Sequence, residues 1–326
     1  MNRLQNLDNI KFLAAFLVIC IHVNFQEGGI IIKSIARIAV PLFILISGYF
    51  FPILSKENKS SKFLKKIIIL TISANIFYFL TNILIFNTHP SPMNWDAIYK
   101  SIIFNESFPF TAIHLWYLNA IIYTVIFAII CTKHLHKLFF LIPILFTLGY
   151  IISSITTNNL FYRNFIFLVL PYFMTGSYLQ YNKEKISTFM RKISKNKLIV
   201  LFFIETILLG VEIFSYQQLK FPVYRDYYFM TLPMALTIFV GATFIFPNKN
   251  IKFVTYIGQK YSSGIYILHI FTMNILTNLT LNFFDIRFDK LYYINTFIIF
   301  IATIILLYLY YTLKRLIVIT IDKITH

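Results

Sequence analysis

The chain has little charge and little cysteine. Charged residues make up 13% of its 326 positions, and only 12 residues are acidic. Because 58% of the residues are hydrophobic, too few polar residues remain to cover a soluble domain of this size, which excludes an ordinary soluble globular protein. The two cysteines, Cys20 and Cys131, lie in or beside apolar segments. This placement argues against a disulfide or a metal site built on cysteine.

Several functional motifs are also absent. The sequence contains no internal repeat and no glycine-rich loop that would cradle phosphates, which argues against ATP-driven chemistry. No H-x-x-H or C-x-x-C string is present, so no metal is expected. No polar stretch is long enough to separate two domains, so we expect one transmembrane domain over residues 1–326. The first apolar segment has no A-x-A-like cleavage site and carries Asp8, so we do not expect a cleaved signal peptide.

Long apolar runs are what the chain has in abundance. Runs of about 20 apolar residues recur from end to end, and this length crosses about 30 Å of hydrocarbon as a helix. We therefore predict an all-α, polytopic integral membrane protein with about ten transmembrane helices. The predicted spans are 10–31, 35–54, 64–87, 114–132, 138–155, 161–181, 198–216, 227–246, 263–283 and 292–313. The longest polar break, 88–113, is expected to be a short external loop with one interfacial helix.

The basic residues predict the orientation. The net charge is +17, but most of the 29 lysine and arginine residues lie in short loops on the side that also holds the N-terminus. Such loops face the cytoplasm, so we predict that both termini are cytoplasmic. The same basic loops suit the anionic headgroups of membrane lipids, and we do not expect nucleic-acid binding.

Polar residues in the first apolar segment are the strongest sign of function. Lys11 and His22 are eleven positions apart, which places them at nearly the same helical azimuth and about 16 Å apart along the axis. Asp8 falls within about 40° of the same line. Such groups are costly to bury and usually mark a polar path or an active site. A histidine kept neutral by burial is a good general base, whereas the simpler alternative for His22 is a hydrogen bond to a neighbouring helix.

Other polar residues lie at the ends of predicted spans. Arg37 and Arg163 each precede an apolar run that contains a proline and a glycine. An arginine at such a position can serve a site, or it can simply extend toward the membrane interface. His114 begins the fourth span beside Trp116 and Tyr117. The two aromatic residues are typical of an interfacial belt, whereas the histidine indicates a role beyond anchoring.

Two spans contain further buried candidates. Glu205 and Glu212 are seven positions apart in the seventh span and share one face, with Glu205 the deeper of the two. Carboxylates inside a membrane are functional candidates, but they can also form ion pairs with arginines such as Arg37 or Arg163. His269 in the ninth span is either part of a site or hydrogen-bonded to another helix.

Four strings together resemble the membrane acyltransferase-3 family. Its opening R/K-x10-H pattern appears as Lys11 through His22, after LDN. VPLFILISGYF resembles its V-P-x-F-F-x-x-S-G-Y, HLWYLNAIIY its H-L-W-F-L, and SSGIYILH its S-x-x-I-Y-x-x-H. The four strings occur in the family's order. In length the chain is most similar to the compact O-acetyltransferases, such as the type that acetylates enterobacterial common antigen.

The resemblance implies an O-acyltransferase in the inner (plasma) membrane of a bacterium. It would use acyl-CoA, with acetyl-CoA expected, and a lipid-linked or surface glycan as acceptor. Many members carry R-x-x-R at the start of the third span, where this chain has Lys65 and Lys66 in KFLKKIIIL. Lys11, Lys65 and Lys66 would attract the CoA phosphates. His22 would act as general base or as an acyl relay, and Asp8 would orient the system or balance Lys11.

The remaining candidates are expected to contact substrate. Arg37 and His114 would hold the acceptor or the developing oxyanion. The other predicted substrate-binding residues are Trp116, Tyr117, Arg163, Glu205 and His269. The acyl group, the acceptor position and the oligomeric state stay open, and a homo-oligomer is one of the states allowed.

A second class of function fits the same polar residues. Histidines and carboxylates inside a membrane also form proton relays, so a proton-coupled transporter or exporter of an envelope glycan or a small solute is the alternative. A scaffold in an envelope-synthesis complex is a third reading, but it leaves Lys11 and His22 unexplained.

Overall fold

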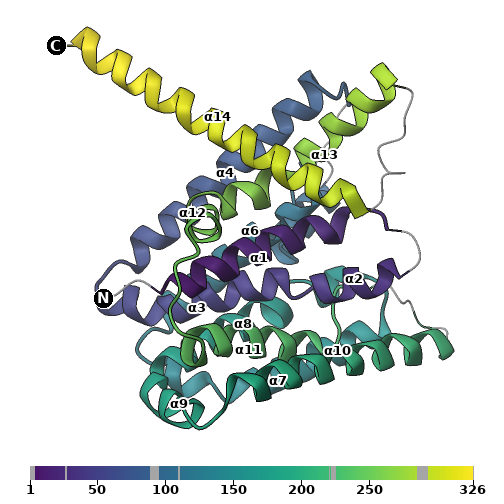
Figure 1. The fold of residues 1–326 in the computed structure, drawn as a ribbon, viewed down its shortest axis with the longest axis vertical. Helices are drawn as coiled ribbons and strands as arrows, with labels where there is room; N and C mark the ends of the chain where they lie inside the picture. The colour runs from purple at the N-terminus through teal and green to yellow at the C-terminus, as the bar shows by residue number, and fades with distance from the viewer. Residues whose placement is uncertain are drawn as a thin grey trace. The chain divides into compact units, whose positions relative to one another are not determined.

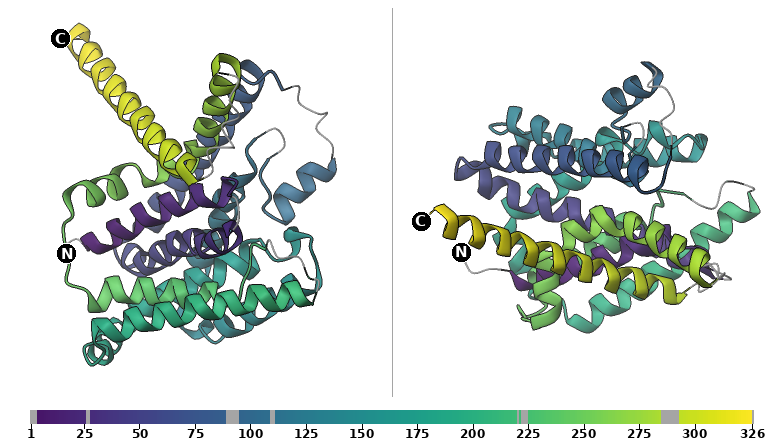
Figure 2. Two further views of the ribbon diagram at one scale, coloured as in Figure 1. Left: turned by 45° about the vertical axis from the view of Figure 1, so that its right-hand side comes forward. Right: turned by 90° about the horizontal axis from the view of Figure 1, so that it is seen from above.

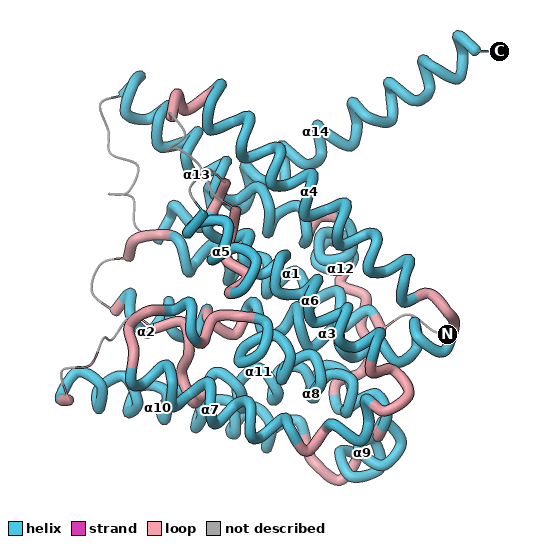
Figure 3. Tube along the Cα trace, turned by 180° about the vertical axis from the view of Figure 1, so that it is seen from behind, coloured by secondary structure: helices cyan, strands magenta, loops and turns pink. Residues whose placement is uncertain are grey.

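A computed structural model describes residues 4–25, 28–88, 95–108, 111–219, 221, 225–284 and 293–325 of the chain. Every regular element in these ranges is a helix, which confirms the prediction of an all-α fold (Figure 3). The chain forms two compact units. The terminal unit consists of Met1–Ala36 and Lys249–His326, and the central unit consists of Arg37–Asn248.

The terminal unit is built around its first helix, α1. In this unit α1 packs against α12, α13 and α14, and α13 also packs against α14 (Figure 1). The C-terminal part of α14 extends away from the other helices of its unit (Figure 2), and its apolar residues, such as Leu313 and Leu316, are exposed. The helices of the unit are α1 (Gln5–His22), α2 (Gly29–Ala36), α12 (Lys252–Lys260), α13 (Ser262–Phe284) and α14 (Tyr293–Thr325).

A glycine brings α12 against α1. A Cβ atom at Gly258 would overlap the backbone carbonyl oxygen of Asp8, so only glycine permits this approach of the two helix backbones. The contact places α12 beside the helix turn that carries Asp8 and Lys11.

The central unit holds the larger number of helices, and α3 and α8 form its closest contact. A Cβ atom at Gly48 would overlap the Phe173 carbonyl, and one at Gly176 would overlap the Leu45 carbonyl. Ser177 Oγ donates a hydrogen bond to the Gly48 carbonyl at 3.0 Å. Small residues at a helix crossing are what a membrane interior requires, because lipid provides no hydrophobic force between helices. The helices of the unit are α3 (Ala39–Lys56), α4 (Ser60–Leu84), α5 (Trp95–Ile103), η1 (Ile113–Leu115), α6 (Trp116–Ile130), η2 (Leu135–Leu138), α7 (Leu141–Ile155), η3 (Asn159–Phe161), η4 (Phe165–Val169), α8 (Leu170–Tyr181), α9 (Lys183–Met190), α10 (Lys195–Gln218), α11 (Thr231–Val240) and η5 (Gly241–Ile245).

Six helices among the described residues are long and apolar enough to cross a membrane. Their outward faces are apolar, and α4 and α10 in particular expose many large apolar side chains. These features support a membrane protein, whereas the predicted count of ten spans and the predicted orientation stay predictions. The six are Gly29–Lys56, Ser60–Leu84, Ile113–Ile130, Lys195–Gln218, Ser262–Leu281 and Tyr293–Val318, and two shorter apolar helices are Leu141–Ile155 and Thr231–Ile245.

The first predicted span, 10–31, is not one helix. α1 starts at Gln5 and ends at His22, and Val23 has an extended backbone with φ −81° and ψ 144°. Gly28 has φ +79°, a conformation that stops a helix and that glycine adopts without strain. The apolar sequence that follows forms the separate helix α2. His22 is therefore the last residue of its helix, not a residue in the middle of a longer one.

Two other predicted boundaries also shift. The sixth span was expected over 161–181, but its helix starts at Phe165, because the Asn164 side chain accepts hydrogen bonds from the N–H groups of Ile166 and Phe167. The helix expected within 88–113 is present as α5, while Pro90, Pro92 and Pro109 of that loop lie outside the described residues.

Candidate functional site

Asp8, Lys11 and His22 lie along α1, and the first two of them form an ion pair. Lys11 Nζ donates a hydrogen bond to Asp8 Oδ1 at 3.2 Å, one helical turn away. The Asp8 side chain is buried and that of Lys11 is partly exposed. Asp8 was predicted either to orient the catalytic groups or to balance the charge of Lys11, and this geometry favours the second role. It also fixes the direction of the ammonium group.

His22, the last residue of α1, contacts a second histidine, His269. The rings of His22 and His269 have centroids 5.1 Å apart and an interplanar angle of 43°. His269 Nδ1 lies 2.8 Å from the Tyr266 carbonyl and 3.2 Å from the Ile265 carbonyl. Carbonyls only accept, so Nδ1 carries a proton, and whenever the ring is neutral Nε2 is an acceptor. We call His22 and His269 the histidine pair.

A small cavity adjoins His22. Its volume is about 160 Å³, and it combines polar groups with apolar walls. Asn24, Thr277 and Asn295 provide the hydrogen-bonding groups beside His22. The space is sufficient for a small acyl group or a few water molecules, since one water occupies about 30 Å³ in the liquid. The full lining is His22, Val23, Asn24, Met273, Thr277, Asn295 and Ile299.

The central unit holds a second cluster, which we call the arginine node. Arg37 Nη1 pairs with Asp226 Oδ1, and Arg163 Nη1 donates to Asp226 Oδ2 at 3.2 Å. Burial alone would raise the pKa of Asp226, but the charges of Arg37 and Arg163 and hydrogen bonds from Asn159 and Arg163 outweigh it and hold this pKa below its usual value. Asp226 is therefore ionised at neutral pH and joins three segments of the unit.

Aromatic side chains extend the arginine node. The Arg163 guanidinium lies over the Trp116 ring, 5.3 Å from its centroid, a cation–π contact. Trp116 and Tyr117 are edge-to-face with centroids 6.4 Å apart, and the Tyr117 hydroxyl is hydrogen-bonded to Ser47. Trp116 and Tyr117 are both 8% exposed. Belt residues at a lipid interface would be exposed, so this burial favours a role inside the unit.

His114 is enclosed in the same unit. It lies in η1, it is buried, and its ring meets the buried Tyr78 ring edge-on at 5.3 Å. The predicted role of His114 in acceptor binding stays a prediction.

The two carboxylates of α10 have separate partners. Glu205 is buried and accepts a hydrogen bond from Thr237 Oγ1 at 2.7 Å. Glu212 accepts from the backbone N–H groups of Phe229 at 2.8 Å and Met230 at 3.1 Å. The alternative that they pair with Arg37 or Arg163 is not what the structure shows, since both arginines pair with Asp226. Glu212 instead anchors the segment just after Asp226.

The lysines expected to attract CoA are divided between the units. Lys65 and Lys66 are exposed in the first turns of α4 in the central unit, whereas Lys11 belongs to the terminal unit. Their shared role at the donor stays a prediction. Within the described ranges, no three His, Cys, Asp or Glu side chains come together as metal ligands.

Asp226 is the residue that sequence reasoning missed. It lies in a polar segment before α11, so it did not draw attention as an intramembrane charge. A usable signal was present, because the predicted topology places Arg37, Arg163 and Asp226 at the same side of the membrane. An acidic residue predicted at the same side of the membrane as two arginines that begin apolar spans is a candidate partner for both.

Comparisons with known proteins identify the family of the chain. An amino-acid racemase of Enterococcus faecalis is 29% identical over 204 residues, which are 54% of this chain and 28% of the racemase. The chain thus spans less than a third of that relative, and the activity of the whole racemase is not carried over. No solved structure matches the chain. The family model described as an acyltransferase domain matches residues 4–312, and the chain therefore belongs to the acyltransferase-3 family.

Proposed function

We propose that this membrane acyltransferase moves an acyl group, first of all acetyl, from cytoplasmic acyl-CoA to a hydroxyl of an envelope or lipid-linked glycan in the inner membrane of a bacterium. Family membership supports acyl transfer. The observation that carries the proposal is His22, which ends the helix that also holds the Asp8–Lys11 pair, contacts the His269 ring and lines a cavity of about 160 Å³.

In the proposed reaction His22 is the general base. It takes the proton of the acceptor hydroxyl while the oxygen attacks the thioester carbonyl. The new C–O bond forms, the C–S bond breaks, and the proton passes from His22 to the departing CoA sulfur. His269 lies with its ring 5.1 Å from that of His22, and its Nδ1 is tied to two backbone carbonyls; its other ring nitrogen is proposed to stabilise the imidazolium.

An acyl relay through His22 is the other form of the mechanism. His22 nitrogen would attack the thioester, CoA would leave as the thiol, and the acceptor hydroxyl would then take the acyl group from the imidazole. The small cavity beside His22 could hold an acetyl group in this intermediate, because Asn24 and Thr277 offer hydrogen bonds to its oxygen.

The arginine node is proposed to serve the acceptor. Each guanidinium has five N–H donors, and Asp226 engages only some of those on Arg37 and Arg163. The remaining donors suit sugar hydroxyls or a developing oxyanion. Trp116 provides the kind of aromatic face against which sugar rings pack, although here Arg163 already covers one part of it.

Purified protein with radiolabelled acetyl-CoA and an envelope glycan fraction tests the proposal. We expect label on the glycan, and we expect His22→Ala to lower transfer by at least about 100-fold, as loss of a general base does. His134→Ala, at an exposed position, is the matched control and should keep full activity. Transfer that survives His22→Ala would overturn the role of His22.

Two further measurements separate the alternatives. Rapid quenching with denaturant at neutral pH, without acceptor, should trap labelled protein only if His22 is an acyl relay, and this label should disappear in His22→Ala. If the protein neither binds nor consumes acetyl-CoA but moves a glycan or solute across vesicle membranes with protons, the transporter alternative holds instead.

A further inference from the structure

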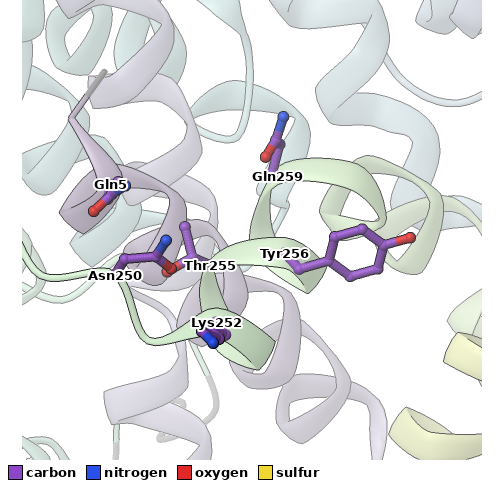
Figure 4. A pocket seen from close by; sticks show the side chains of 6 residues that line it. All are labelled: Gln5, Asn250, Lys252, Thr255, Tyr256 and Gln259. Carbon is purple, nitrogen blue, oxygen red and sulfur yellow. The ribbon is translucent and has the colours of Figure 1, made fainter. Parts of the chain in front are cut away.

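The terminal unit contains a polar cavity that the proposed mechanism does not use. It lies where the first residue of α1 meets α12, and its volume is about 300 Å³ (Figure 4). Side chains from both helices and from the preceding loop line it, namely Gln5, Asn250, Lys252, Thr255, Tyr256 and Gln259. Figure 4 shows Gln5, Asn250 and Thr255 gathered toward one end, with Tyr256 and Gln259 toward the other.

The lining of the cavity has the chemistry of an anion site with polar recognition groups. Three of its six side chains are amides, Lys252 is positively charged, and none of the six is a carboxylate. Lys252 is also the first residue of α12, where Ile251 makes no side-chain capping bond. The N–H groups of that first turn therefore lack intrahelical partners and favour a negative charge.

The cavity is held in shape by hydrogen bonds to α1. Thr255 Oγ1 donates to Asn9 Oδ1 at 2.7 Å, and the Lys249 N–H donates to Asn6 Oδ1 at 3.0 Å. Asn9 Nδ2 in turn donates to the Lys249 carbonyl at 3.1 Å. These bonds fix the loop before α12 without a ligand, and such preorganisation lowers the entropy lost on binding.

The far wall is fixed by a lysine within a group of tyrosines. Lys260 Nζ donates to the Tyr256 hydroxyl at 2.9 Å. The same ammonium group lies 5.2 Å from the Tyr256 ring centroid, 5.3 Å from that of Tyr261 and 5.4 Å from that of Tyr311. Lys260 thereby orients Tyr256 and adds a second positive charge behind the wall.

We propose that this cavity binds the phosphorylated nucleotide end of the acyl-CoA donor, an inference that rests on the proposed function. Amides such as Gln5 and Gln259 both donate and accept, which matches the edge of a purine, while Lys252 and the start of α12 match a phosphate. The volume is at the lower end for ligand pockets, so it suits the nucleotide and not the whole of CoA.

The position of the cavity on α1 agrees with this assignment. Gln5 is the first residue of α1 and His22 the last, so the cavity and the proposed base are about 26 Å apart along the helix axis at 1.5 Å per residue. The pantetheine arm of CoA, which links the nucleotide to the thioester, would run between them past Lys11.

The test measures binding of adenosine 3′,5′-bisphosphate, which is the nucleotide end of CoA without the acyl arm, to the purified full-length protein by calorimetry. We expect Lys252→Ala to weaken binding at least tenfold. Lys62→Ala, an exposed lysine of α4, is the matched control and should bind like the wild type. Gln259→Leu should weaken the nucleotide but leave binding of inorganic phosphate unchanged. Thermal unfolding of each variant confirms that it is folded.

The outcomes separate this inference from the proposed function. His22→Ala should bind the bisphosphate normally while it fails to transfer acetyl groups. If the wild type transfers acetyl groups but Lys252→Ala binds the bisphosphate unchanged, the nucleotide site is overturned and the proposed function stands. If binding follows Lys252 but no acyl transfer occurs, the nucleotide site stands and the proposed function fails.

The phosphate of a lipid headgroup could occupy the same cavity in place of the nucleotide. Binding is therefore repeated in nanodiscs of phosphatidylcholine with and without phosphatidylglycerol. Nucleotide affinity that stays the same in both supports the proposal. Nucleotide binding that is lost in the anionic nanodiscs and kept in phosphatidylcholine alone, at the same ionic strength, would assign the cavity to a lipid headgroup and overturn it.

Discussion

Two aspartates in this protein hold their basic partners in different ways. Asp8 pairs with Lys11 one turn away on the same helix, whereas Asp226 pairs with Arg37 and Arg163, which lie far away in the sequence. The first pair fixes the direction of one side chain. The second fixes the positions of three chain segments, so its loss leaves two guanidiniums without their carboxylate. We therefore expect Asp8 to matter mainly for substrate and Asp226 mainly for stability.

The largest effect is expected for Asp226→Ala. Removing one partner of a buried ion pair costs about 3–5 kcal/mol, and the 15% exposure of the Asp226 side chain places this case near the lower end. Thermal or denaturant unfolding in detergent measures the loss. Asp96→Ala breaks the exposed Asp96–Lys100 pair of α5 and should leave the unfolding temperature almost unchanged. Equal losses for the two variants would contradict the structural role of Asp226.

The pH dependence of stability gives a second test of the ionised Asp226. The pKa of Asp226 is lowered in the folded protein, so its contribution to stability is complete above the unfolded-state pKa of about 3.9. It is lost as the pH falls through the lower folded-state pKa. The stability advantage of the wild type over Asp226→Asn should therefore be constant from pH 7 to 5 and shrink below about pH 4. Unfolding temperatures across this range test it, and a constant difference would count against an ionised Asp226.

A smaller effect is expected where α12 contacts the backbone of Asp8. Gly258→Ala forces the two helices apart, because the new Cβ overlaps the Asp8 carbonyl, and overpacking of this kind costs about 1–3 kcal/mol. We also expect a raised KM for acetyl-CoA. Gly210→Ala in α10 is the matched control, since no atom lies within 4 Å of its Cβ, and it should be neutral or slightly stabilising. The same response at both glycines would argue against a close contact at Gly258.

The smallest change in stability is expected for Asp8→Asn. Asn removes the buried negative charge while keeping the shape of the side chain, and the partly exposed Lys11 ammonium stays solvated, so the unfolding temperature should hardly move. The KM for acetyl-CoA should rise severalfold with a smaller change in kcat, because Lys11 loses its fixed direction. In the double variant with Lys11→Ala the two effects should not add, since both act on one ammonium group. Unfolding as marked as that of Asp226→Ala would remove the distinction between the two aspartates.

The sequence predicts those features of the fold, such as shared helix faces, that depend on residues close together in the chain. The spacing of Asp8 and Lys11 predicts their shared face, and the apolar run after Ser262 predicts α13 nearly to its ends. The end of α1 at His22 was not predictable from hydropathy, because the apolar run resumes at Ile30 and the turn depends on the backbone of Gly28.

Contacts between distant segments could not be predicted in the same way. His22 and His269 belong to different predicted spans, and no periodicity connects them. Asp226 offered a topological hint, but hydropathy alone does not choose between Asp226, Glu205 and Glu212 as the partner of an arginine. The choice depends on which segments fold together, and Glu212 is already satisfied by two backbone N–H groups.

Helix α14 is longer than the hydrocarbon core of a membrane is thick. At 33 residues it extends about 50 Å, whereas the hydrocarbon core accommodates about 20 residues of helix. Lys314 and Arg315 follow an apolar stretch of about that length, and we expect them to set the point where the helix reaches the headgroups. The last turns then stand outside the hydrocarbon, so a reporter placed there reads the side of the membrane from a single helix.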